Sequence, residues 1–105
     1  MKSIPDISGN YFCDLSGNIY NKHKKELKAF SSYGSYYRIN LNNKKYAVHR
    51  LVALTYLNNI DNKPCVDHIN NDIHDNRLEN LRWASYSENR LNQKRYKIDG
   101  DTIRT

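Results

Sequence analysis

One strongly apolar segment, residues 48–57 (VHRLVALTYL), limits what this chain can fold into. Its apolar positions recur three and four residues apart, which is the spacing of one face of an α-helix. That face consists of Val48, Leu51, Val52 and Thr55, widened by Leu54 and Leu57. Because only 38% of the 105 residues are hydrophobic, we expect this largely buried helix to lie at the centre of one small domain or of two sub-modules that share a thin core.

Two β-hairpins are predicted upstream of this helix. Residues 10–20 contain two short β-prone runs around a Ser-Gly-Asn turn signal. Residues 36–41 and 45–48 flank a short Asn-rich turn, and asparagine tolerates the positive φ angles of tight turns. In the first strand of this second hairpin, alternate residues share one face that we expect to lie in the core, namely Tyr37, Ile39 and Leu41.

The polar stretch that follows the helix is predicted to form a strand, a long polar loop, a second strand and a helix. Residues 65–68 and 81–84 should be the two extended segments. The helix should begin at Ser85 or Ser87 and run to about residue 97, and Ser85 with Glu88 three residues later fits a capping box. The elements together indicate an α+β fold.

The distribution of charge favours a polyanionic partner. The net charge is +6, and it is concentrated in residues 21–50, which carry +7, and residues 81–105, which carry +3. Nucleic acid is the commonest partner of such a chain, although a basic surface kept only for solubility would look the same. Residues 51–80 carry −3, and an acidic segment between two basic ones suits a metal site at which phosphate arrives.

Several classes of protein are disfavoured by the cysteines and by the hydropathy pattern. Cys13 and Cys65 are far apart and belong to no CxxC pair, so we expect no structural zinc, and a disulfide is not indicated. The first residues lack the apolar region of a signal peptide, and no apolar run approaches the length of a membrane span. We therefore expect a protein of a reducing, intracellular compartment with no membrane partner.

Four polar side chains in residues 66–90 could together hydrolyse a phosphodiester. Asp67 and Asn89 offer oxygen ligands for Mg²⁺ or Mn²⁺, which would complete its shell with water and phosphate oxygens. His68, on the opposite side of the strand, could take the proton of the attacking water, and the side-chain carbonyl of Asn80 could fix the imidazole tautomer. Each also has a structural interpretation, because the Asp-His pair could be solvated surface and the asparagines could satisfy backbone groups.

In this stretch the chain resembles the HNH endonucleases, or ββα-metal nucleases, and in particular their phage and intron homing-endonuclease branch. The matching elements are Asp67-His68, Asn80 within Glu79-Asn80-Leu81, and Asn89, where this branch commonly replaces the last histidine of the name. The resemblance, which is strong over residues 46–90, implies a single metal held by Asp67 and Asn89, with His68 as general base and Asn80 orienting it. It further implies a DNA endonuclease or nickase of the cytoplasm of a bacterium or of a phage-infected cell.

Double-stranded DNA is accordingly the expected partner. Residues 1–47 are predicted to form a β-rich DNA-contacting region, residues 48–97 the ββα-metal nuclease core with its preceding helix, and residues 98–105 a tail. Phosphates should meet the basic residues Lys24, Lys25, Arg38, Lys44, Lys45, Arg50, Arg82, Arg90, Lys94 and Arg95. One such site cuts one strand, so cutting both needs a homodimer or two successive events. The alternative is a DNA- or RNA-binding protein that keeps the fold without cleavage.

Some residues compete for these roles. Asn76 is a rival to Asn80, but it lies nine rather than thirteen residues after Asp67, which favours a loop-capping role. Arg50 could pair with an acidic neighbour instead of a phosphate. His49 is expected to be a structural histidine whose hydrogen bonds are satisfied, and His74 is expected to be solvated. Trp83 is expected to anchor the core.

Overall fold

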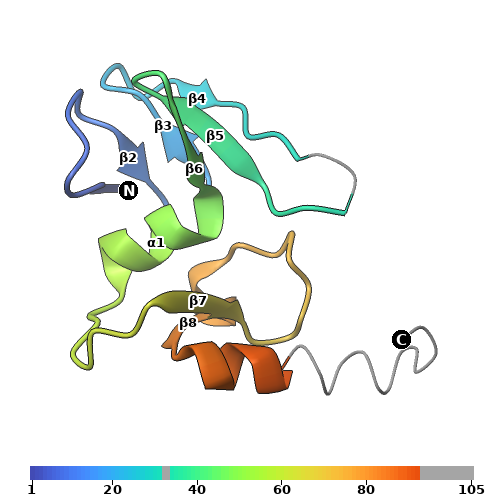
Figure 1. Cartoon of the computed structure of the whole chain (residues 1–105). Coiled ribbons are helices and arrows are strands. Elements are labelled where there is room, and N and C mark those ends of the chain that lie inside the picture. Colours follow the sequence, from blue (N-terminus) through green and yellow to red (C-terminus); the bar gives the residue numbers. More distant parts are fainter. Residues whose placement is uncertain (32–33, 93–105) are drawn as a thin grey trace.

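Helix α1 (Val48–Tyr56) forms where the apolar segment predicts it, and it lies between two groups of strands (Figure 1). The computed structural model describes residues 1–31 and 34–92. On one side of α1 are β1 to β6, and on the other side are β7, β8 and a C-terminal helix. The strands and the 3-10 turn η1 are β1 (Lys2–Ser3), β2 (Phe12–Cys13), β3 (Ile19–Tyr20), β4 (Glu26–Leu27), β5 (Arg38–Leu41), β6 (Lys44–Ala47), β7 (Cys65–His68), η1 (Leu78–Asn80) and β8 (Leu81–Ala84).

The core surrounds α1, as its periodicity predicts. The buried residues of the helix are Val48, His49, Leu51, Val52, Ala53 and Thr55. Leu54 was expected to widen the apolar face but is 37% exposed. That side of the helix lines a cavity beside Trp83 instead of meeting a strand, so the apolar face is narrower than the sequence indicates.

The first four strands form one antiparallel sheet in the order β1-β2-β3-β4, which we call the N-terminal sheet. The predicted turn in residues 10–20 connects β2 and β3, where the carboxylate oxygen Oδ1 of Asp14 accepts from the backbone N–H groups of Ser16 and Asn18 at 3.0 and 2.9 Å. Gly17 completes this turn with a φ of 91°, a conformation that side-chain-bearing residues rarely adopt. The first hairpin is thus confirmed.

The second predicted hairpin is β5–β6. Its turn residues Asn42 and Asn43 have φ angles of 53° and 66°, as a two-residue hairpin turn with positive φ at both positions requires. Ile39 and Leu41 are buried, whereas Arg38 and the other alternate residues of β5 are exposed, so the predicted faces are confirmed. Val48 follows β6 directly, which places the start of α1 beside this hairpin.

The polar stretch folds as strand, loop, strand and helix. Strands β7 and β8 pair antiparallel, and the helix after β8 is described over residues 86–92. The capping box is present, because Ser85 N donates to Glu88 Oε1 at 2.8 Å and Glu88 N donates to Ser85 Oγ at 3.1 Å. The rest of the expected helix, to residue 97, lies outside the described residues. Within the described part of the chain no helix is long and apolar enough to cross a membrane.

Candidate active site

Strand β7 carries Asp67 and His68 into the interior, where both side chains are nearly inaccessible at 3% and 4% exposure. Consecutive residues of a strand point to opposite sides, so the carboxylate and the imidazole face different neighbours. Asp67 is opposite Arg82 of β8, and His68 is opposite Leu81. The two residues are therefore not the solvated surface pair that the sequence left open.

The Asp67 carboxylate is held by two side chains. Arg82 donates to Oδ2 through Nε at 3.0 Å and Nη2 at 2.9 Å. Asn92, on the C-terminal helix, donates through Nδ2 to Oδ1 and Oδ2 at 3.1 Å each, and to the backbone oxygen of His68 at 3.2 Å. Arg82 was predicted to contact DNA phosphate, but in this structure it forms an ion pair with Asp67 because strand register brings the two residues together.

Asn89 and Asp67 line the same small cavity, together with His68 and Tyr36. Its volume of about 20 Å³ is room for roughly one water molecule or one ion. The described residues include no cluster of three or more His, Cys, Asp or Glu side chains that could hold a metal on their own. A carboxylate and an amide oxygen at one cavity instead suit a hard cation that keeps several waters, as Mg²⁺ does.

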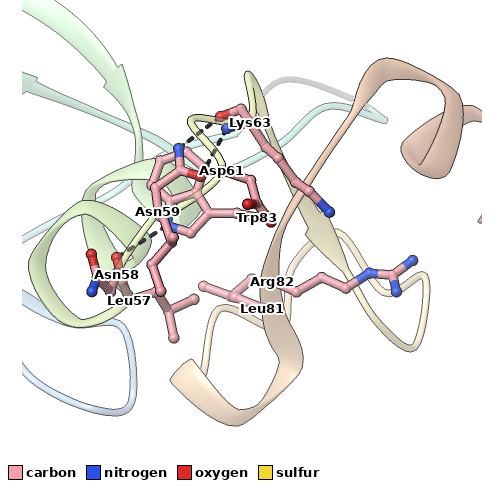
Figure 2. Close-up of a pocket in the computed structure, with 9 residues that line it drawn as sticks. Leu57, Asn58, Asn59, Asp61, Lys63, Leu81, Arg82 and Trp83 are labelled. Atoms are coloured by element: carbon pink, nitrogen blue, oxygen red, sulfur yellow. Dashed lines mark hydrogen bonds between the residues drawn. The ribbon is translucent and has the colours of Figure 1, made fainter.

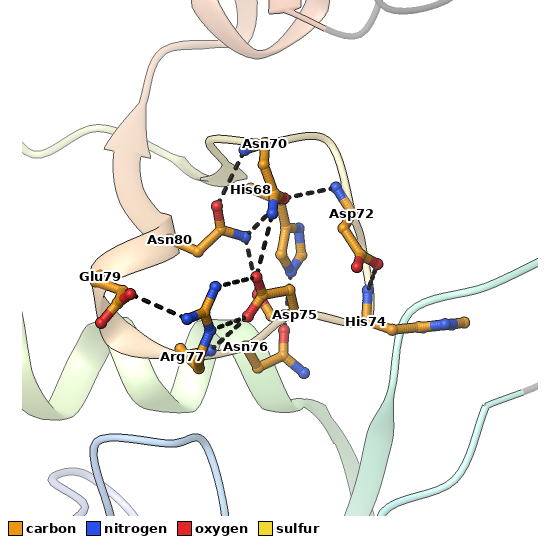
Figure 3. Close-up of polar contacts among 9 residues, drawn as sticks. All are labelled: His68, Asn70, Asp72, His74, Asp75, Asn76, Arg77, Glu79 and Asn80. Carbon is orange, nitrogen blue, oxygen red and sulfur yellow. Dashed lines mark hydrogen bonds and ion pairs between the residues drawn. The ribbon is translucent and has the colours of Figure 1, made fainter. Parts of the chain in front are cut away.

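The imidazole of His68 is held by Asn76, whose Oδ1 is 2.8 Å from Nε2 (Figure 3). An amide oxygen can only accept a hydrogen bond, so with the amide in this orientation Nε2 carries the proton and Nδ1 carries the lone pair. Asn76 was predicted to cap the loop, and that prediction is wrong. Its side chain, 8% exposed, reaches the ring because the loop turns back toward β7.

Asn80, predicted to orient His68, instead closes the loop formed by residues 69–77, which we call the connecting loop. Its Oδ1 accepts from the backbone N–H of Asn70 at 3.0 Å, and its Nδ2 donates to Asn70 Oδ1 at 2.9 Å and to the Asp75 backbone oxygen at 3.0 Å. Asn80 ends η1 beside the start of the loop, where Ile69 N also donates to its backbone oxygen at 2.8 Å. The position of η1 thus directs the amide at the loop backbone.

Burial lowers the pKa of His68 below its ordinary value of 6.5, while the hydrogen bond to Asn76 and the charges of Asp67, Asp72 and Asp75 oppose that shift. The imidazole is therefore neutral near pH 7. A neutral ring whose Nε2 proton is already held presents Nδ1 as its only proton acceptor. This is the protonation state that a general base needs before it reacts.

The connecting loop is held by its own polar contacts (Figure 3). Arg77 forms ion pairs with Asp75 at 2.8 Å and with Glu79 at 3.0 Å. The side-chain hydrogen bond from Arg77 is the largest influence that holds the pKa of Asp75 well below its usual range. His74, expected to be solvated, lies 2.9 Å through Nε2 from the Ser35 backbone oxygen, although its side chain stays exposed.

His49 packs beneath the candidate base. Its ring centroid is 4.7 Å from those of His68 and Tyr36. Its Nδ1 is buried and has no hydrogen-bond partner among the described residues, so it is not the satisfied structural histidine that we predicted. Desolvation by burial lowers the pKa of His49 to about 3, and the neighbouring His68 and Arg50 act in the same direction.

This buried histidine predicts how stability depends on pH. The pKa of His49 is about 3 in the folded protein and 6.5 as the ordinary value, so below pH 6.5 the unfolded state binds more protons. Its contribution is therefore complete above pH 6.5 and falls by up to about 1.4 kcal/mol per pH unit as the pH decreases toward 3. Urea unfolding between pH 4 and 8 should show this fall, and His49→Phe should flatten it. Equal pH dependence in both proteins would contradict the assignment.

The basic residues proposed for DNA contact are distributed over several surfaces. Exposed side chains are found at Lys24, Lys25, Arg38, Lys44, Lys45 and Arg90. Arg50 is exposed too, and its guanidinium donates to the Pro64 backbone oxygen at 2.8 Å and lies 5.4 Å from the Trp83 ring centroid, so its contact with a phosphate stays a prediction. Lys94 and Arg95 lie outside the described residues.

A larger cavity, of about 310 Å³, lies between β8 and the loop after α1 (Figure 2). Asn59 closes that loop by accepting from Lys63 N and donating to the Lys63 backbone oxygen, both at 2.8 Å. Trp83, half-buried against the core as predicted, donates through Nε1 to the Leu57 backbone oxygen at 3.1 Å. The described lining contains no imidazole or thiol, and its ionisable side chains are Asp61, Lys63 and Arg82.

Sequence reasoning missed two contributors to the site. Asn92 follows Asn89 by three residues, and residues three apart share a helix face, so helical periodicity was a usable signal. Tyr36 stacks on the His68 ring with centroids 5.8 Å apart, and no role at the site was predicted for it. No local pattern marks that stacking, because it depends on how the segment before β5 lies against the end of β7.

Comparison with known proteins places this geometry in context. Residues 46–91 match the family of HNH endonucleases. A protein described as an uncharacterised HNH endonuclease of Acanthamoeba polyphaga mimivirus is 41% identical over 97 residues, which cover 84% of this chain and 24% of that protein. The DNA endonuclease I-HmuI of Bacillus phage SP01 is 33% identical over 97 residues, which cover 88% of this chain and 56% of the phage protein.

A solved structure gives the same result for the fold. The structure described as DNA binding and cleavage by the HNH homing endonuclease I-HmuI superposes with a TM-score of 0.78 and 32% identity, covering 90% of this chain and 57% of that one. The α+β class and the predicted arrangement of hairpins, helix and ββα motif are therefore confirmed. The chain spans between 24% and 56% of the length of the curated relatives named above.

Proposed function

Because this chain belongs to the HNH endonuclease family, through its residues 46–91, we propose that the protein is a divalent-metal-dependent DNA endonuclease or nickase. The observation that carries the proposal is the meeting of Asp67, His68 and Asn89 at one small cavity. A chain that kept the fold only to bind nucleic acid would have no need of a buried carboxylate and a neutral, hydrogen-bonded imidazole at that point.

Asp67 and Asn89 would hold the cation, through a carboxylate oxygen and the side-chain amide oxygen. Oδ1 of Asp67 accepts only from Asn92 among the described residues, so it retains capacity for a further partner while Arg82 stays on Oδ2. A bound Mg²⁺ or Mn²⁺ supplies the positive charge that stabilises the leaving 3′ oxygen. Arg82 and Asn92 would keep the carboxylate oriented, as hydrogen bonds behind a ligating group commonly do.

His68 would act as the general base. Its Nδ1 accepts a proton from the attacking water, while the Nε2 proton stays on the hydrogen bond to Asn76. The ring becomes an imidazolium, and the charges of Asp67, Asp72 and Asp75 favour that form. The proton taken up is later released to solvent, which returns the base to its starting state.

The exposed lysines of the β5–β6 hairpin should contribute affinity for DNA that does not depend on sequence. Replacing Lys44 and Lys45 with alanine should weaken the binding of all duplexes about equally. The slope of log affinity against log salt should become smaller by up to about 0.9 for each phosphate that a lysine no longer neutralises. Salt titrations of duplex binding measure this. Lys63→Ala is the matched control, because Lys63 is already paired with Glu88 at 3.0 Å. Unchanged slopes in the double variant would remove these lysines from the interface.

The proposal is tested by incubating supercoiled plasmid with the protein and Mg²⁺ or Mn²⁺, with EDTA as the control. We expect nicked product with either cation, and linear product if two molecules act together or two cuts follow one another. No product at several salt concentrations, despite measurable DNA binding, would identify a DNA-binding protein that does not cut. A clear preference for single-stranded RNA over duplex DNA would equally contradict the proposal.

A further inference from the structure

The N-terminal sheet touches the connecting loop at the residue that holds His68. The β2–β3 turn lies against the end of this loop, where Leu78 N donates to the Leu15 backbone oxygen at 2.9 Å. Two residues further along the turn, Gly17 is so close to Asn76 that a β-carbon at position 17 would lie 2.7 Å from the Asn76 backbone oxygen. No real side chain fits at that distance without a shift of the loop.

The contact between Gly17 and Asn76 is tight, but there is free space beside it. Gly17 and Asn76 also line a cavity of about 200 Å³, to which His74 of the loop contributes as well. Asn76 therefore has space to move into if it is pushed. A larger residue at position 17 would displace Asn76 from His68 without having to unfold the domain.

A second segment before the HNH match also touches the loop. Nε2 of His74 lies 2.9 Å from the Ser35 backbone oxygen, and its ring centroid is 4.7 Å from that of Tyr37. Through His74, Asn76 and Leu78, the connecting loop and the start of η1 thus touch parts of the chain that lie outside residues 46–91. Among the described residues, the other hydrogen bonds and ion pairs of the loop stay within residues 68–92, as in the ion pair of Arg77 with Asp75 and the hydrogen bond from Asn71 Nδ2 to Asn92 Oδ1 at 3.2 Å.

From these contacts we infer that the N-terminal sheet is part of the catalytic site. The close approach of Gly17 fixes the place of Asn76, and Asn76 fixes the tautomer and position of the His68 ring. The inference rests on the proposed function, in which His68 is the base. Asn76 and Gly17 are positioning residues, and the sheet has a task in cleavage besides any contact with DNA.

The test compares four variants of the protein. Asn76→Ala removes the acceptor of the His68 Nε2 proton, and Asn76→Asp keeps an acceptor oxygen of the same size. Gly17→Ala adds the clashing methyl group. Gly34→Ala is its matched control, because Gly34 also has a positive φ, of 72°, but has nothing within 4 Å of the added carbon. Circular dichroism and thermal unfolding establish that each variant is folded.

The readouts are the ¹⁵N shifts of the His68 imidazole in metal-free protein at pH 8, and cleavage at saturating DNA. We expect a single Nε2–H tautomer in wild type, Asn76→Asp and Gly34→Ala, and loss of that single state in Asn76→Ala and Gly17→Ala. Cleavage should fall about 10²-fold in Asn76→Ala and about tenfold in Gly17→Ala, since displacements near 1 Å have effects of this size, with DNA affinity unchanged.

The inference is overturned if Gly17→Ala matches Gly34→Ala in both tautomer and cleavage, or if Asn76→Ala keeps the Nε2–H tautomer. If the proposed function itself is wrong, the wild-type protein will not cleave DNA at all, which distinguishes that outcome from failure of this inference. The tautomer pattern would still decide whether the sheet positions the ring.

Discussion

Replacing Asp67 should abolish metal-dependent cleavage. Its carboxylate is the only acidic group among the described residues that line the cavity shared with Asn89, so its loss would remove the main attraction for a cation there. A bound metal supplies several kcal/mol of transition-state stabilisation, and each 1.4 kcal/mol is about tenfold in rate, so we expect a fall of more than about 10³-fold. Plasmid cleavage and Mn²⁺ binding to the free protein measure the two consequences separately.

The choice of substitution matters at this position. Asp67→Ala leaves the Arg82 guanidinium without this acceptor and leaves the buried Asn92 amide with the His68 backbone oxygen alone, which would also destabilise the fold. Asp67→Asn keeps an acceptor oxygen of similar shape while it removes the charge. Both variants should lose Mn²⁺ binding, and the asparagine variant should keep most of its thermal stability and DNA affinity. Normal cleavage by either variant, with DNA binding lost, would mean that Asp67 has been given the wrong role.

Replacing His68 should lower turnover by about 10² or more, which is the usual consequence of losing a general base. The reason is structural, because burial and the Asn76 hydrogen bond leave Nδ1 as the free acceptor of the neutral ring. His68→Ala should leave DNA and Mn²⁺ affinity nearly unchanged, since the imidazole is not a proposed ligand of either. Single-turnover cleavage at saturating DNA isolates the chemical step.

His23→Ala is the control for this substitution. His23 is exposed in the turn before β4, so its loss removes a histidine without touching the interior. It should cleave like wild type. If His68→Ala also cleaves like wild type, or if its only defect is in DNA binding, the base is another group.

Much of the fold could be predicted because its signals are local. The three- and four-residue spacing from Val48 through Leu51 to Thr55 defines a helix. Asn42-Asn43 defines a hairpin turn, and Ser85 with Glu88 defines a helix start. Each of these depends on residues within a few positions of one another. The extent of the apolar face did not follow in the same way, since Leu54 could be placed only once its surroundings were known.

The candidate site was predictable in composition but not in its hydrogen bonding. Spacing along the chain selected Asp67, His68 and Asn89, and the structure brings them to one cavity. Spacing also favoured Asn80 over Asn76 as the partner of His68, and this was wrong. A loop of this length can return either residue to the ring, and the outcome is decided by where η1 and the Gly17 turn hold the loop.

The ion pair between Arg82 and Asp67 illustrates a second limit on what can be predicted from the sequence. Sequence separation suggests no interaction between them, and the pairing follows only from the register of β7 against β8. Once the register is known, Arg82 cannot be counted simply among phosphate contacts. Its charge balances the carboxylate that would hold the cation.

One measurement tests the central claim most directly. The rate of plasmid nicking at saturating DNA is compared for wild type, His68→Ala and Asn89→Ala, each in Mg²⁺ or Mn²⁺ and each at equal DNA occupancy. We predict metal-dependent nicking by wild type that leaves 3′-hydroxyl and 5′-phosphate ends, with both variants strongly impaired and only Asn89→Ala partly restored by higher metal concentration. Nicking that persists in EDTA, or that survives loss of His68, would contradict the account.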